Sequence, residues 1–292
     1  MSQKNTQQSS QKMETVRIKK SHLVDIFNHR VVRKLGHSRY AQAQKTATEC
    51  HKKLTKALTN FEEKKITKSH ILSKARKYDF YYMHPHSYIP FIRGLLRTIE
   101  AHKIAQSDMR MFSVIDCRWD TDNVKFTFDA NTMTRRLQRG LKGLHWIGMI
   151  EFAVFNDSAD VKGGKYTIAP HFHGIMWGEL EKERELQLNK FFRGGAKGAD
   201  GFRASKVTDL VGAVTYCVKL LSHGYKMPDD GNFTRKIRRL TIAQCYMLYK
   251  LLESYTYGDL LVSGGDQGFR LRIALEKHLR RKDSDFRKRN TA

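Results

Sequence analysis

Cysteine is scarce in this sequence and its copies are scattered. Four cysteines occur in 292 residues, with no C-x-x-C pair among them: Cys50, Cys117, Cys217 and Cys245. Zinc modules use closely spaced pairs, and small secreted domains use a dense set of disulfides. The scattering argues against both and favours reduced thiols in a cytoplasmic protein.

Three further features are missing. No apolar run approaches the roughly 20 residues of a membrane-spanning helix. The start, MSQKNTQQSSQK, lacks the apolar centre of a signal peptide. No GxxxxGK[ST] loop is present, so a nucleotide-driven helicase motor is not expected in this chain. These absences predict a cytoplasmic protein with no membrane partner.

Acidic residues are few relative to basic ones. The chain has 29 Asp and Glu against 54 Lys and Arg, a formal net charge of +25. Such a surplus attracts polyanions, and nucleic acid is the favoured one because phosphate neutralisation releases counterions. An anionic membrane surface is the rival. A purely structural role on nucleic acid would explain the charge but not the 11% aromatic content and the patterned apolar segments.

Composition divides the chain into four parts. A polar, disordered tail is expected over 1–12, a basic and mainly helical region over 13–107, a core over 108–228, and a basic helical region over 229–292. In the two flanks, apolar periodicity predicts helices over 88–105, 241–255 and 271–279, and the last residues read as a solvated basic tail.

The core alternates between strand and helix patterns. Strands are predicted over 111–119, 145–155, 165–178 and, more briefly, 202–207. Helices are predicted over 124–144, 180–192 and 207–225. This order favours an α+β fold, with an antiparallel sheet and helices of the split βαβ type.

A pair of histidines stands in the third predicted strand, in the segment APHFHGIMWG. On a strand His171 and His173 share one face, whereas Phe172 points to the other. Glu151 lies in the preceding strand, in the apolar context GMIEFAVF, where an unpaired carboxylate would be costly to bury. If the two strands pair through the 156–165 loop, two imidazoles and a carboxylate form a site for a divalent ion. The alternative is a pair of satisfied polar residues with no ion.

A tyrosine lies on the predicted helix over 207–225. An apolar stripe occupies one side of this helix, and the other side gathers Asp209, Gly212, Tyr216, Lys219 and His223. A tyrosine becomes a nucleophile when a nearby cation favours its phenolate. Lys219, three residues after Tyr216, lies on the same face, and an ion held by the histidines would stabilise charge on a phosphate. The alternative is a solvated polar face.

Together these motifs resemble the HUH endonuclease superfamily, on its replication-initiator side. PHFHG at 170–174 resembles the metal-binding signature, and Tyr216 with Lys219 in VTYCVKLL resembles the Y-x-x-K motif of single-tyrosine initiators. Glu151 fits the third-ligand position. The resemblance covers 108–228, and MFSVIDCRW matches the first motif poorly.

The resemblance implies a mechanism and partners. His171, His173 and Glu151 would hold Mg²⁺ or Mn²⁺, and Tyr216, steadied by Lys219, would cut single-stranded or hairpin origin DNA. The products would be a 5′-phosphotyrosine and a free 3′-OH, with a host helicase and polymerase continuing replication. The residues expected to bind DNA are Arg203, Lys206, His223 and Lys226.

Three alternatives stay open. A transposase of the same superfamily would act on transposon ends. A non-catalytic nucleic-acid-binding protein would bind without cutting. A relaxase would need an upstream tyrosine, either Tyr40 or one within 78–88, where no metal motif is found.

Overall fold

The structure is a computed structural model that describes residues 85–122, 126–156, 166–195, 199–218, 223–226, 236–252 and 254–290, together with residues 49 and 56. The tail over 1–12 and most of the region over 13–84 lie outside these residues. None of the helices in the described ranges is long and apolar enough to cross a membrane.

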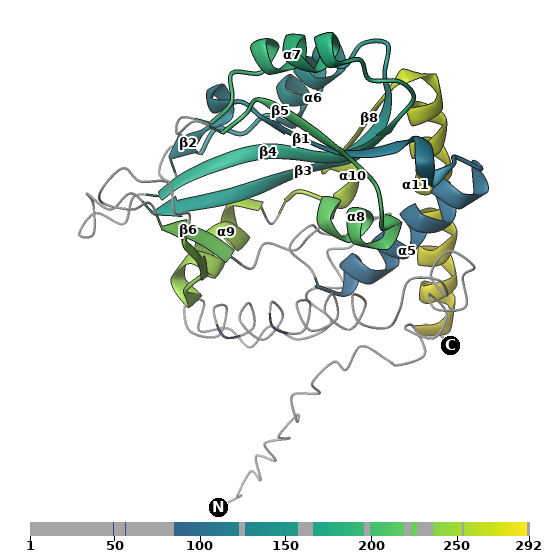
Figure 1. Cartoon of the computed structure of the whole chain (residues 1–292). Helices are drawn as coiled ribbons and strands as arrows, with labels where there is room; N and C mark the ends of the chain where they lie inside the picture. Colours follow the sequence, from purple (N-terminus) through teal and green to yellow (C-terminus); the bar gives the residue numbers. More distant parts are fainter. Residues whose placement is uncertain are drawn as a thin grey trace, which may run out of the picture.

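An α+β fold is formed by one mostly antiparallel sheet with helices on both faces (Figure 1). The strand order is β5-β1-β4-β3-β6-β7, with β2 paired to β4 and β8 paired to β3. The strands are β1 (Met109–Ile115), β2 (Thr121–Asp122), β3 (His145–Asn156), β4 (Tyr166–Trp177), β5 (Phe202–Lys206), β6 (His223–Lys226), β7 (Lys236–Arg239) and β8 (Leu261–Gly264). The β3–β6 pair is parallel and the other pairs are antiparallel.

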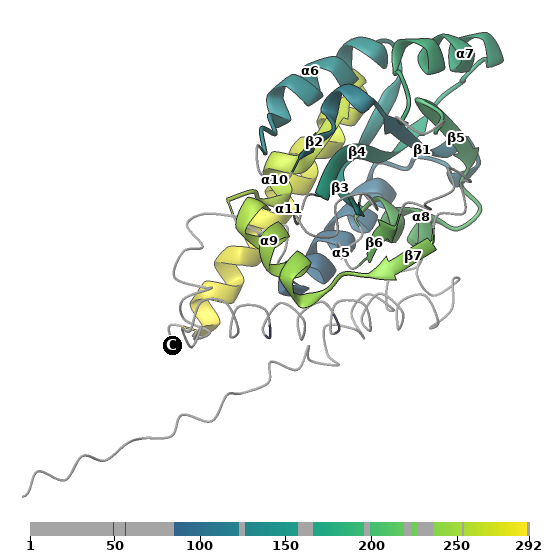
Figure 2. The same cartoon turned by 90° about the vertical axis from the view of Figure 1, so that its left-hand side faces the viewer.

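The helices form two layers. Helices α6 (Ala130–Gly140) and α7 (Lys182–Phe191) cover one face of the sheet, and α5 (Pro85–Ala101) and α8 (Leu210–Cys217) lie on the other (Figures 1 and 2). Helix α11 (Gly265–Asn290) packs against α5 and β3. Two more helices, α9 (Ile242–Leu252) and α10 (Tyr257–Leu260), and two 3₁₀ turns, η1 (Gln106–Asp108) and η2 (Cys117–Trp119), complete the described elements.

An aromatic core lies between the sheet and the α6–α7 layer. The rings of Phe112, Trp146 and Phe172 are fully buried and pack edge-on or tilted, with centroids 5.3 to 6.2 Å apart. Two paired glycines make room for them: a Cβ on Gly174 would lie 2.7 Å from the Phe172 ring, and one on Gly148 would lie 2.5 Å from it. The glycine that ends PHFHG thus serves the packing of Phe172.

The expected elements of the core are present, with changed ends. The patterned segments around 145–155, 165–178, 180–192 and 202–207 form β3, β4, α7 and β5. The strand expected over 111–119 ends at Ile115, because Cys117–Trp119 forms the 3₁₀ turn η2. The helix expected over 124–144 begins only at Ala130, where the Asp129 side chain accepts a hydrogen bond from the Asn131 amide as an N-cap.

The helix expected over 207–225 was predicted wrongly in its second half. Helix α8 ends at Cys217, and His223–Lys226 forms strand β6. The segment around Val214, Thr215 and Val218 is rich in β-branched side chains, which weaken a helix. Pairing of β6 with both β3 and β7 supplies the competing backbone bonds.

The flanking regions also differ from expectation. The helix expected over 88–105 runs from Pro85 to Ala101, and the helix expected over 241–255 spans Ile242–Leu252. Helix α11 is much longer than the predicted 271–279 and includes most of the basic end of the chain. The region after 229 also contributes strands β7 and β8 to the sheet.

Candidate metal centre

The two central strands bring both histidines and the glutamate together. Strands β3 and β4 pair along twelve residues, and Glu151 lies directly opposite His171. His173, two residues further along β4, projects from the same face. Phe172 projects from the other face into the aromatic core. The H-x-H pattern therefore places two histidines on one face of β4 and a buried phenylalanine on the other.

Glu151, His171 and His173 form a buried group that could hold a metal ion. The Oε2 atom of Glu151 lies 3.5 Å from Nε2 of His171 and 3.7 Å from Nε2 of His173. These separations exceed the usual hydrogen-bond length of about 2.7–3.2 Å. Two ligand atoms each about 2.1 Å from one ion lie roughly 3.0–3.4 Å apart. The spacing therefore fits a shared ion after a small contraction, and the donor set of two imidazoles and one carboxylate suits a divalent metal.

The Nδ1 atoms of both imidazole rings contact other groups of the protein. Nδ1 of His171 lies 3.1 Å from the carbonyl oxygen of Ala169, to which it donates because a carbonyl only accepts. Nδ1 of His173 lies 2.7 Å from Oγ of Ser113 on β1. Both Nε2 atoms are left facing Glu151. Metal-ligating histidines commonly show this arrangement, with one nitrogen held and the other presented.

Tyr216 on α8 lies against this group. Its ring contacts that of His173, with centroids 4.7 Å apart and planes at 70°. Asp209 caps the start of α8 by accepting from the Gly212 amide at 2.9 Å. Gly212 is buried, whereas the Tyr216 residue is 43% exposed. The phenol therefore lies beside the candidate ion site and open to solvent.

The segment after β1 carries a further carboxyl to the site. Asp120 follows η2 and precedes β2, whose Thr121 pairs with Ile168 of β4. Burial raises the pKa of Asp120 to about 6, against the opposing influence of nearby His171 and with a smaller contribution from Asp116. Asp120 was not among the residues expected from the sequence.

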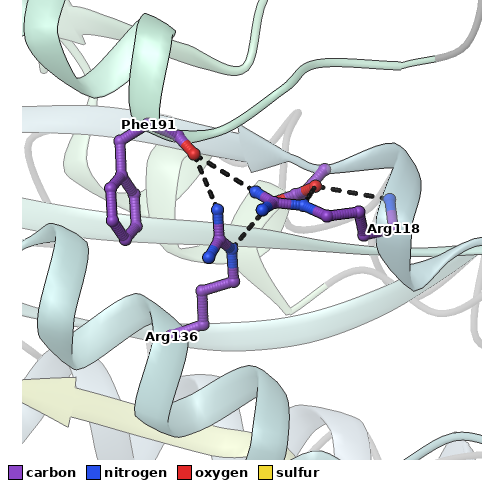
Figure 3. Close-up of polar contacts among 4 residues, drawn as sticks. Arg118, Arg136 and Phe191 are labelled. Carbon is purple, nitrogen blue, oxygen red and sulfur yellow. Dashed lines mark hydrogen bonds and ion pairs between the residues drawn. The ribbon is translucent and has the colours of Figure 1, made fainter.

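A buried ion-pair cluster fixes the start of this segment. Asp116 is fully buried, and it accepts from Nε of Arg136 at 2.8 Å and from Nε of Arg118 at 2.7 Å. Both arginines also donate to the carbonyl oxygen of Phe191, at 2.7 and 3.2 Å (Figure 3). The Arg136 guanidinium lies over the Phe191 ring, 4.4 Å from its centroid. We name these four residues the Asp116 clamp. It joins the end of β1 to α6 and to the end of α7.

The residues expected to bind DNA are not all on one surface. Arg203 is exposed on the edge strand β5 and pairs with Ser113, which pairs with His173, so all three project from the same face. Lys206 pairs with Arg110 and projects from the opposite face.

The remaining sequence-predicted residues lie elsewhere. His223 and Lys226 stand on β6, which pairs with β3 near Phe155, about 13 Å along the strand from Glu151. Lys219 lies outside the described residues.

Sequence reasoning missed Ser113 and Asp120. Ser113 is the one polar side chain of the segment MFSVI at 111–115, and that interruption was an available signal. No sequence signal indicated Asp120, because its position depends on the 3₁₀ turn between β1 and β2.

Comparisons of the chain with protein-family models, with characterised proteins and with solved structures found no match. The function must therefore be inferred from the geometry of the site itself.

Proposed function

We propose that this protein is a metal-dependent endonuclease that nicks and rejoins single-stranded DNA, with Tyr216 as its nucleophile, in the manner of a rolling-circle initiator. One observation carries the proposal: an exposed phenol contacts one of two histidines whose Nε2 atoms converge on a buried carboxylate. The net charge of +25 supports a polyanionic substrate.

Glu151, His171 and His173 would hold Mg²⁺ or Mn²⁺. When bound, such an ion supplies positive charge next to the scissile phosphate and polarises one of its oxygens. The two Nδ1 contacts keep the imidazoles in fixed orientations, so the ligand atoms need little rearrangement on binding.

Tyr216 carries the covalent step. Its phenol loses a proton, the phenolate oxygen forms a bond to phosphorus, and the bond between phosphorus and the 3′ oxygen breaks. The departing oxygen takes up a proton and becomes a free 3′-OH. One phosphodiester replaces another, so a later 3′-OH can reverse the step, release Tyr216 and close the strand. Lys219 is the proposed cation beside the phenolate, as the Y-x-x-K resemblance implies.

Covalent trapping tests the proposal without knowledge of the cleavage sequence. The wild-type protein is incubated with Mn²⁺ and a library of single-stranded oligonucleotides, some able to form hairpins. We expect a protein–DNA adduct that survives denaturing electrophoresis, disappears with chelator, and is absent in Tyr216→Phe. Tyr255→Phe is the matched control, because the Tyr255 hydroxyl donates to the carbonyl of Phe128 on another part of the fold.

Two results would contradict the proposal. An adduct formed by Tyr216→Phe at the wild-type rate would remove Tyr216 as the nucleophile. Salt-sensitive DNA binding with no adduct under any divalent ion would support a non-catalytic DNA-binding protein instead. Sequencing the trapped DNA then separates an initiator, which selects an origin, from a transposase, which selects transposon ends.

A further inference from the structure

We infer that Ser113 is the positioning residue of the ion site, because its hydroxyl accepts the Nδ1 proton of His173 and so holds Nε2 ready for the ion. This inference rests on the ion site of the proposed function. It concerns a residue on β1, the strand where the sequence resembles the superfamily least.

The contact itself is short and well placed. Ser113 Oγ lies 2.7 Å from Nδ1 of His173, which is 4% exposed. Ser113 and His173 are direct partners across β1 and β4, so the backbone of both is fixed by the sheet ladder. A neutral imidazole carries one proton on its two nitrogens. For Nε2 to present its lone pair to an ion, that proton must be on Nδ1, and the hydroxyl must accept it.

The two histidines differ in what holds them. The partner of His171 is the carbonyl of Ala169, which only accepts and which no side-chain substitution removes. The partner of His173 is a side chain, and it can be removed by one substitution. In a Ser113→Ala protein, the ion-ready tautomer of His173 would leave its buried Nδ1–H without the Ser113 acceptor, a penalty that falls on the ion-bound state.

The position also explains why a polar residue interrupts an apolar strand. Phe112 and Val114, the neighbours of Ser113 on β1, are buried on one face of the sheet. Ser113 projects from the other face, in the same row as Arg203 of β5 and His173 of β4. An apolar side chain here would pack equally well in a strand but could not bind the imidazole.

Ion affinity in the absence of DNA tests the inference. Mn²⁺ binding is measured by electron paramagnetic resonance or calorimetry for the wild type, Ser113→Ala, Ser113→Thr and Ser205→Ala. We expect Ser113→Ala to lower the affinity about 10–100-fold, as loss of a partner of a metal-ligating histidine commonly does. Ser113→Thr keeps the hydroxyl and should stay close to wild type. Ser205→Ala is the matched control, since Ser205 is exposed on β5 and pairs with Met111.

A spectroscopic readout on the wild-type protein gives a first test that does not depend on the folding of a variant. In ¹⁵N-labelled wild-type protein loaded with diamagnetic Zn²⁺, long-range ¹H–¹⁵N spectra should show both His171 and His173 protonated at Nδ1. In Ser113→Ala, the His173 Nδ1 proton should exchange faster with solvent while that of His171 is unchanged.

Each outcome bears on the inference. The role of Ser113 is overturned if Ser113→Ala binds the ion as tightly as the wild type does. It is also overturned if His173 is unprotonated at Nδ1 in the Zn²⁺-loaded wild type; neither result affects the proposed function. A wild-type protein that binds no divalent ion overturns this role and the metal step of the proposed function together. If the protein binds the ion and Ser113→Ala lowers the affinity as expected, but no DNA is cleaved, only the proposed function is contradicted.

Discussion

Replacing Asp116 by asparagine should destabilise the whole fold, because the Asp116 clamp joins three elements through one buried carboxylate. Asn keeps the size of the side chain and removes its charge. One amide oxygen can still accept from an arginine, but the NH₂ group then faces a guanidinium that has only donors. The substitution therefore tests the charge of Asp116 rather than its volume.

The magnitude follows from the contacts. A hydrogen bond to a charged group contributes about 1.5–3 kcal/mol, and Asp116 has two arginine partners. The Arg118 and Arg136 side chains are 34% and 21% exposed, so both regain some hydration when the carboxylate charge is lost. We therefore expect a loss of about 2–4 kcal/mol. At about 2–4 °C for each kcal/mol in a protein of this size, the melting temperature should fall by roughly 5–15 °C.

Urea and thermal unfolding measure this loss. Asp200→Asn is the control, since Asp200 is exposed and its substitution should change stability by less than about 0.5 kcal/mol. The double variant Asp116→Asn with Arg136→Gln should show a coupling of about 1–3 kcal/mol. An Asp116→Asn protein as stable as the Asp200→Asn protein would refute the idea that the clamp holds β1, α6 and α7 together.

Three further perturbations have definite expected results. Mn²⁺ at one hundred times its dissociation constant should stabilise the wild type by about 2.7 kcal/mol. Glu151→Gln should abolish this stabilisation, and an unchanged Mn²⁺-induced rise in melting temperature would exclude Glu151 as a ligand. Gly174→Ala should destabilise by about 1–3 kcal/mol in urea unfolding, since its Cβ would press on Phe172, whereas Gly258→Ala, whose Cβ has space, should not. The pKa of Asp120, raised from 3.8 to about 6, means that the folded state binds its proton more tightly. With chelator present, the free energy of unfolding should thus fall by about 1 kcal/mol as pH rises from 4 to 7, after allowance for solvent screening. Asp120→Asn should reduce this dependence of stability on pH. The same dependence in both proteins would contradict the raised pKa of Asp120.

Strong, local patterns made the hairpin that carries the site predictable. Alternation in β4 placed His171 and His173 on one face, and the cost of burying Glu151 alone indicated a partner on the next strand. The α+β class followed from the order of such patterns, and the structure confirms it.

Elements whose ends depend on distant partners were not predictable in the same way. The apolar periodicity after Val207 predicted a helix that extends to Tyr225. Helix α8 nevertheless ends at Cys217, because β6 forms backbone hydrogen bonds with β3 and β7. The turn η2 is stabilised by Asp116, which accepts from Arg136 20 residues further along the chain, and by Arg118, which donates to the carbonyl of Phe191 73 residues further along. Helical and strand periodicity report only local preferences, so they could not place Asp120 beside His171.

The distribution of burial around the site argues against a purely structural pair of histidines. Side-chain exposure rises from 2% for Glu151 to 6% for His173 and 13% for His171, and the Tyr216 residue is 43% exposed. A pair of histidines that only stabilises the fold would be expected to hold the carboxylate at hydrogen-bond distance, whereas the two Nε2 atoms lie 3.5 and 3.7 Å from Oε2 of Glu151. Both Nε2 atoms thus face one buried carboxylate without bonding closely to it, and the ring of His173 contacts that of the exposed Tyr216. An ion held there would be enclosed on the side of Glu151, and Tyr216, the proposed nucleophile, lies on the more exposed side of the group.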